Sequence, residues 1–139
     1  MTGEFHLRLA RPGEEDAIVQ FLDAHWEWKL PLVHVPQFFE FYYRPFGGAP
    51  QFALALQGGR ICAAAGFIRA NAGENPDIWA SIWAADEAAP GAGMELMAAL
   101  PRLANARFCA VNNIRKKVVG LYRFLGYDAG RLQIGRAHV

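Results

Sequence analysis

The sequence predicts a single domain of the mixed α/β class, with a central sheet and helices on both of its faces. The chain has 139 residues, which is long enough for one substantial core. Three strand-like segments follow one another in the middle of the chain, and helical segments lie on either side of them. This order indicates a mixed sheet that is covered on two faces.

The N-terminal half predicts a strand, two helices and a hairpin. Phe5–Leu9 alternates apolar and polar side chains, as a short strand does. Acidic residues then begin a helix, and its buried stripe is expected at helical spacing, over Ala17, Ile18, Phe21, Leu22 and His25. Prolines bracket a second helix over Gln37–Tyr43. Phe52–Leu56 and Ile61–Ile68 flank a two-glycine turn, which predicts a hairpin.

The C-terminal half predicts a fourth strand, a helix, a fifth strand and a last helix. The strands cover Ile78–Ala84 and Phe108–Val111, and the last helix ends in the segment Leu121–Tyr127. Alternation along the fourth strand would put Trp79, Ser81 and Trp83 on one face. Such aromatic side chains suit either stacking against a ligand in a cleft or burial in the core.

Composition excludes several classes of function. The chain is 53% hydrophobic and 19% charged, as ordinary soluble globular proteins are. Its net charge of +1 does not favour nucleic acid or an anionic membrane as a partner. No apolar run approaches the ~20 residues of a membrane span, and the N-terminus lacks a signal-peptide block. Cys62 and Cys109 lie in predicted strands, where reduced thiols are expected, so we expect a cytoplasmic protein.

The last six residues, Ile134–Val139, match the translation of a common sequencing adapter. We therefore expect one domain over residues 1–133 and a non-native tail over 134–139, with the natural chain truncated. A genuine six-residue tail is the alternative. In either case His138 is excluded from the chemistry.

The turn between the fourth strand and its helix offers a site for an anion. Gly91 and Gly93 lack the Cβ atoms that block close approach of the backbone, and the helix contributes the positive end of its dipole. The expected donors are backbone amides, those of Ala89, Gly91, Ala92, Gly93 and Met94. A plain strand-to-helix turn is the alternative.

This Gly91-Ala92-Gly93 turn and the string Leu121-Tyr122-Arg123-Phe124-Leu125-Gly126-Tyr127 resemble the GNAT superfamily of N-acetyltransferases, over nearly the whole chain. The resemblance implies the GNAT fold, a mostly antiparallel mixed sheet, with the last strand or strands missing here. It implies acetyl-coenzyme A (acetyl-CoA) as co-substrate and no metal. Ala88 departs from the family pattern, which has Arg or Gln at that position.

The resemblance also assigns roles to residues around the coenzyme. In the family, the tyrosine aligned with Tyr122 protonates the departing thiolate. Reference pKa values of a phenol and a thiol make this proton transfer uphill by ~1.5 units, roughly 2 kcal/mol. A bulge in the fourth strand exposes backbone to the coenzyme arm, at Ile82, Trp83 and Ala84 in this chain. Asn112 is an additional expected contact.

The acceptor side is less defined. His25, Trp26 and Trp79 are the expected substrate contacts, and Asp77 and Glu27 are the candidate bases, none of them decisive. The strings around His25-Trp26, Asp77-Ile78-Trp79 and Tyr122 resemble a subgroup associated with surface-polysaccharide biosynthesis. That subgroup implies an amino sugar or a sugar nucleotide as acceptor.

The leading hypothesis is an N-acetyltransferase in which a primary amine of a small molecule attacks acetyl-CoA directly. The alternative is a non-catalytic GNAT-like module that binds coenzyme A or a partner protein. The oligomeric state is open, with a homodimer as one option.

Overall fold

The computed structural model describes residues 4–26, 31–111 and 119–128. Its strands are β1 (His6–Leu9), β2 (Phe52–Gln57), β3 (Arg60–Arg69), β4 (Asp77–Ala85) and β5 (Phe108–Val111). Its helices are α1 (Glu15–His25), α2 (Pro31–His34), α3 (Pro36–Tyr43), α4 (Ala92–Leu103) and α5 (Val119–Phe124). The predicted mixed α/β class is confirmed. The short helix α2 was not predicted; it starts at a proline, which is favourable at a first helical position.

The five strands form one sheet in the order in which they occur along the chain. The pairs β1–β2, β2–β3 and β3–β4 are antiparallel, whereas the pair β4–β5 is parallel. The sheet is therefore mixed and mostly antiparallel, as predicted. The β2–β3 hairpin turns at Gly58 and Gly59, whose φ angles of 60° and 79° are the left-handed values that a tight hairpin turn requires.

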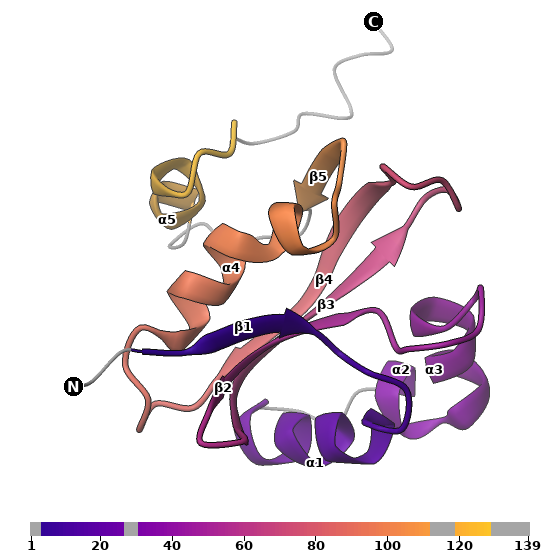
Figure 1. Ribbon diagram of the computed structural model, residues 1–139, viewed down its shortest axis with the longest axis horizontal. Coiled ribbons are helices and arrows are strands. Elements are labelled where there is room, and N and C mark those ends of the chain that lie inside the picture. Colours follow the sequence, from indigo (N-terminus) through magenta and orange to yellow (C-terminus); the bar gives the residue numbers. More distant parts are fainter. Residues whose placement is uncertain (1–3, 27–30, 112–118, 129–139) are drawn as a thin grey trace, which may run out of the picture.

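Helices cover both faces of the sheet (Figure 1). On one face, which we call the α4 face, Leu96, Met97 and Leu100 of α4 pack on the sheet together with Tyr122 of α5. On the other, the α1 face, α1 and α3 supply the buried side chains, which include Ile18, Leu22, Phe39 and Tyr43.

The buried stripe of α1 is narrower than its spacing predicts. Ile18, Phe21 and Leu22 are buried, but Ala17 and His25 are exposed. His25 is the last residue of the helix, and its ring rests on Phe21 at a centroid distance of 4.4 Å. The side chain therefore borders the core and is accessible from solvent.

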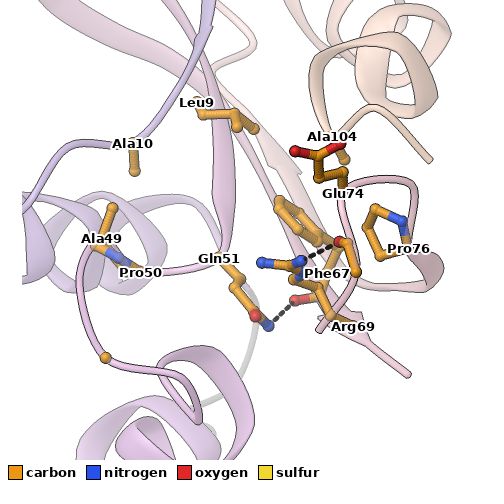
Figure 2. Close-up of a pocket in the computed structure, with 12 residues that line it drawn as sticks. Leu9, Ala10, Ala49, Pro50, Gln51, Phe67, Arg69, Glu74, Pro76 and Ala104 are labelled. Carbon is orange, nitrogen blue, oxygen red and sulfur yellow. Dashed lines mark hydrogen bonds between the residues drawn. The ribbon is translucent and has the colours of Figure 1, made fainter. Parts of the chain in front are cut away.

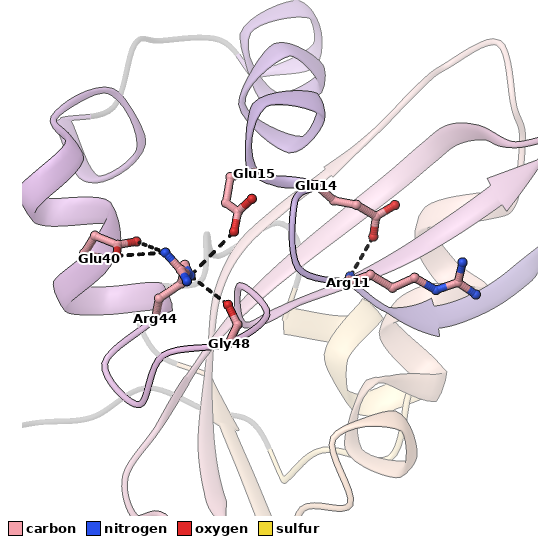
Figure 3. A network of polar contacts seen from close by, with 6 residues as sticks. All are labelled: Arg11, Glu14, Glu15, Glu40, Arg44 and Gly48. Atoms are coloured by element: carbon pink, nitrogen blue, oxygen red, sulfur yellow. Dashed lines mark hydrogen bonds and ion pairs between the residues drawn. The ribbon is translucent and has the colours of Figure 1, made fainter.

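Arg44 joins three segments on the outer side of the α1 face (Figure 3). Its Nη1 donates to both carboxylate oxygens of Glu40 at 2.8 Å, and its Nε donates to the Gly48 carbonyl at 2.8 Å. Glu15 of α1 lies 3.5 Å away. One guanidinium thus ties α3 to α1 and to the loop that leads into β2.

None of the helices in the described ranges is long and apolar enough to cross a membrane.

Candidate functional site

Strand β4 has a bulge in its pairing with β3, next to the point where its pairing with the described part of β5 ends. On the β3 side, Ala65 pairs with Trp83 and Phe67 with Ala80, so Ser81 and Ile82 together stand opposite Gly66. On the β5 side, pairing runs from Asp77 to Ala80 and ends there, at the last described residue of β5. β4 itself continues to Ala85. Within the described residues, its second half therefore has no partner on the β5 side.

The extra residue at the bulge changes which side chains share a face. Ile78 and Ala80 belong to the core of the α4 face, whereas Ile82 and Ala84 belong to that of the α1 face. The prediction that Trp79, Ser81 and Trp83 share one face is wrong for this reason. Trp83 packs on the α4 face, whereas the Ser81 hydroxyl lies 2.8 Å from that of Tyr43, a buried residue of the α1 face.

The turn after β4 presents three backbone amides that have no partner among the described residues. The amide of Ala89 donates to the Asp86 carbonyl and that of Ala92 to the Ala89 carbonyl, so two of the five predicted donors are already used. The other three, on Gly91, Gly93 and Met94, donate to no described atom. Gly91 precedes α4 with φ of 90°, a left-handed conformation that suits glycine. These amides point from the positive end of a twelve-residue helix, a favourable place for an anion.

Asp86 stabilises this turn, and it was not among the residues predicted for the site. Its carboxylate accepts from the Ala88 amide at 2.9 Å and from Arg60 at 2.8 Å. The Ala88 amide, then Arg60 and His25, lower the pKa of Asp86. An Asp that bonds the amide two residues ahead is a recognisable turn signal, so Asp86-Glu87-Ala88 could have revealed it.

Gly93 also has a packing role, which the sequence did not predict. A Cβ atom on Gly93 would lie 3.0 Å from Cβ of Ala85 and 3.3 Å from Nε1 of Trp83. The indole of Trp83 also donates to the Gly93 carbonyl at 3.1 Å. Gly93 therefore lacks a side chain because α4 packs closely on β4, although its amide still faces the turn.

Tyr122 brings α5 to this end of the sheet. It is 6% exposed, and its ring meets Trp83 edge-on at 5.8 Å and Tyr127 at 5.5 Å. The Tyr127 hydroxyl lies 3.1 Å from Sγ of Cys109 in β5. Burial, and secondarily Cys109, raise the pKa of Tyr122, so the phenol stays protonated near neutral pH and can act as a donor.

The structure does not bring Asp77 to this end of β4. Asp77 lies seven positions before Ala84, which corresponds to roughly 23 Å of strand. Its carboxylate accepts from Nε and Nη2 of Arg107 at 3.0 and 2.8 Å. The hydrogen bond from Arg107 lowers the pKa of Asp77, which makes the carboxylate a weaker base.

The other predicted acceptor residues are partly placed. His25 is exposed at the end of α1, close enough to Asp86 to influence its pKa. Trp79 is 43% exposed, and Trp26 is half-buried, with an indole N–H that has no partner among the described residues. Glu27 and Asn112 lie outside the described residues, as does the predicted tail over 134–139. No group of three metal-ligating side chains is found in the ranges that the structure describes.

No family model matches the sequence, and neither does any curated protein. Solved structures do match its fold. The aminoglycoside N-acetyltransferase AAC(6')-Iy, in complex with coenzyme A, has a TM-score of 0.65 and 13% identity, covering 96% of this chain and 94% of the other. An aminoglycoside acetyltransferase from an uncultured soil metagenomic sample, in complex with sisomicin, has a TM-score of 0.64 and 12% identity, with coverages of 94% and 92%.

A GNAT-family acetyltransferase from Streptococcus pneumoniae has a TM-score of 0.60 and 15% identity, covering 96% of this chain and 99% of the other. At such low identity the similarity concerns the fold. The bulged β4, the glycine turn and the crossover to β5 therefore belong to a chain that has the fold of GNAT acetyltransferases.

Proposed function

We propose that this protein transfers an acetyl group from acetyl-CoA to a primary amine of a small molecule, by direct attack of the amine on the thioester. The observation that carries the proposal is the set of amides at Gly91, Gly93 and Met94, which follow β4 directly and donate to no atom of the described residues. Solved proteins of the same fold bind coenzyme A or a coenzyme A conjugate.

The two halves of the coenzyme would use different parts of this region. The amides before α4 suit the diphosphate, because several donors converge there at the positive end of a helix. The backbone of Ile82, Trp83 and Ala84 suits the amide-bearing arm, which would add as an extra strand to the edge of β4 that pairs with no described residue of β5.

Tyr122 is the proposed acid for the departing thiolate. The pKa of Tyr122 is raised, so full proton transfer from its phenol to a thiolate is more uphill than the reference values suggest. We therefore propose that the phenol donates a hydrogen bond to the sulfur, and that this bond strengthens as negative charge develops there. No residue is proposed as the base.

Direct transfer is favoured over an acetylated cysteine. Cys62 is completely buried, so its thiol is shielded from any acyl donor in solution, and its Sγ lies 3.6 Å from the Arg60 carbonyl. Burial raises the pKa of Cys109, which lowers its thiolate fraction. Neither thiol has the environment of an activated nucleophile.

For the acceptor, we propose an amino sugar or a sugar nucleotide. Two of the structures with this fold are aminoglycoside acetyltransferases, one of them bound to sisomicin. Trp79 offers an exposed ring for stacking on a sugar, and His25 and Trp26 lie at the end of α1. A primary amine on such a molecule needs only to lose its proton before attack.

Calorimetry with acetyl-CoA, followed by thiol release with a panel of aminoglycosides and amino sugars, tests the proposal. We expect Tyr122→Phe to lower kcat about 10- to 100-fold, with the affinity for acetyl-CoA nearly unchanged. Tyr42→Phe, which removes a phenol from α3 on the opposite face, is the matched control and should leave kcat unchanged.

The same measurements separate the alternative function. Binding of acetyl-CoA without thiol release for any amine would identify a non-catalytic coenzyme A-binding module. A cysteine that is acetylated and then turns over would contradict direct attack.

A further inference from the structure

A cavity lies at the opposite end of α4 from the glycine turn. Its volume is about 310 Å³, near the lower end of the size range of small-molecule sites. The end of β1, the loop before β2, the end of β3, the loop before β4 and Ala104 at the end of α4 line it (Figure 2). Helix α4 has twelve residues, so roughly 18 Å of helix separates this cavity from Gly91.

Arg69 of β3 supplies one wall of the cavity. Its Nη2 donates to the Gly73 carbonyl at 2.7 Å, and its Cζ lies 5.3 Å from the centroid of the Phe46 ring. These contacts fix the guanidinium plane. Its Nε is buried and has no hydrogen-bond partner among the described residues. Because Nε is shielded from solvent, a ligand in the cavity would reach the guanidinium through Nη1, which donates to no described residue.

The facing wall carries negative charge. Glu74 and Ala104 lie together across the cavity from Arg69 (Figure 2). Ala104 is the residue that caps the C-terminal end of α4, where the helix dipole has its partial negative charge. Neither Arg69 nor Glu74 forms an ion pair with any residue that the structure describes.

The remaining lining includes a buried amide and several apolar side chains. Gln51 is 8% exposed, and its amide donates to the Phe67 carbonyl at 3.0 Å, which holds the base of the cavity together. Leu9, Pro50 and Pro76 contribute apolar surface. A small ligand would therefore meet a planar cation at one end, a carboxylate at the other and hydrocarbon between them.

We propose that this cavity binds a small zwitterion of the amino acid type. The carboxylate of the ligand accepts hydrogen bonds from the Arg69 guanidinium, whose planar donors match a carboxylate. The ammonium group lies toward Glu74 and the end of α4. This site is separate from the proposed coenzyme site and does not depend on it.

The test is titration of the full chain with a panel of free L-amino acids, by calorimetry and by ligand-observed NMR. Each amino acid is compared with its N-acetyl derivative, which lacks the cation, and with its decarboxylated amine, which lacks the anion. We expect at least one free amino acid to bind, and both of its derivatives to bind about tenfold or more weakly.

Variants of Arg69 and Glu74 test which charged group of the ligand each residue binds. Arg69→Gln should weaken binding of the free amino acid about tenfold or more. Glu74→Gln should weaken the free amino acid but leave the N-acetyl derivative unchanged. Arg102→Gln removes an exposed cation of α4 outside the cavity and should change neither. Because Arg69 also bonds Gly73, circular dichroism checks its fold, and Glu74→Gln in an exposed loop provides the independent variant.

Two results would overturn the proposal: no free amino acid binds, or binding is the same in both cavity variants as in the unchanged protein. Acetyl-CoA affinity, measured on the same samples, should be unaffected by Arg69→Gln and Glu74→Gln. A failure of coenzyme binding is therefore recorded separately from a failure at this cavity.

Discussion

The ion pair between Arg8 and Glu14 joins β1 to the start of α1. Arg8 donates from Nη1 and Nη2 to the two carboxylate oxygens of Glu14, each at 2.8 Å. The Arg11 amide adds a bond of 2.6 Å to the same carboxylate. Hydrogen bonding to Arg8, more than any other contact, lowers the pKa of Glu14 from 4.5 to about 2.

This pair predicts a pH-dependent contribution to stability. Because the carboxyl pKa is lower in the folded state, its contribution is complete above the unfolded-state pKa and is lost as the pH falls toward the folded-state value. We expect Glu14→Gln to lower the free energy of unfolding by about 1 kcal/mol at neutral pH, since the pair is partly exposed. The difference between variant and unchanged protein should shrink on acidification, toward zero near pH 2.

Urea denaturation at several pH values measures this difference. Glu4→Gln is the control, because Glu4 is exposed and belongs to no ion pair of the described chain. A Glu14→Gln difference that did not vary with pH would argue against the assigned pKa.

Asp77 gives a second prediction at the scale of one residue. Arg107 holds both oxygens of its carboxylate and lowers its pKa, and the start of β4 is far from the bulge. We expect Asp77→Asn to change kcat less than about threefold, whereas loss of a general base typically costs about 100-fold or more. Steady-state kinetics with any accepted amine measures the ratio, and a 100-fold loss would restore Asp77 as the base.

At the scale of elements, the contact between α4 and β4 depends on a missing side chain. A Cβ on Gly93 would come within 3.0 Å of Ala85 Cβ, whereas a Cβ on Gly120 of α5 would meet nothing within 4 Å. We expect Gly93→Ala to destabilise the protein by about 1–3 kcal/mol through overpacking. Gly120→Ala should be neutral or stabilising by up to about 1 kcal/mol, because alanine favours helix.

The free energy of unfolding in urea compares the two glycine variants directly. Both substitutions add one methyl group inside a helix, so their intrinsic helix propensity is matched. Equal changes in the two variants would mean that α4 can move away from β4 at little cost.

The strands and long helices could be predicted because each has a strong local pattern. Alternation, helical spacing and the Gly58-Gly59 turn are properties of neighbouring residues, and they were read correctly in β1, the β2–β3 hairpin and α3. The bulge at Ser81 could not be found in this way, because it arises from pairing with Gly66, fifteen positions earlier in the sequence. The faces of β4 were therefore predicted wrongly beyond it.

At the scale of the whole molecule, the backbone amides of the candidate site could be predicted from the sequence. The hydrogen-bond partners of its residues could not, partly because some of them lie far away in the sequence. The glycine turn predicts free amides before a helix, but only the structure reveals that two of these amides already donate to the carbonyls of Asp86 and Ala89. Likewise, Asp77 is a plausible base in the sequence until Arg107 is found against it, thirty residues later. The Arg69 cavity joins five segments that have no common motif.

The final prediction concerns the stability of the whole domain when the coenzyme binds. A ligand that binds only the folded state stabilises it by about 2.7 kcal/mol at 100 times its Kd, wherever its site lies. For a domain of this length that corresponds to a rise in Tm of about 5–10 °C.

Pantetheine, which has the arm of coenzyme A but no diphosphate, should raise Tm much less, because it leaves the amides of Gly91, Gly93 and Met94 unpaired. Thermal denaturation monitored by circular dichroism measures both shifts, and Glu14→Gln should lower the starting Tm without changing the coenzyme-induced shift, since distant sites act additively. Equal shifts with coenzyme A and pantetheine, or none with either, would remove the diphosphate from this turn.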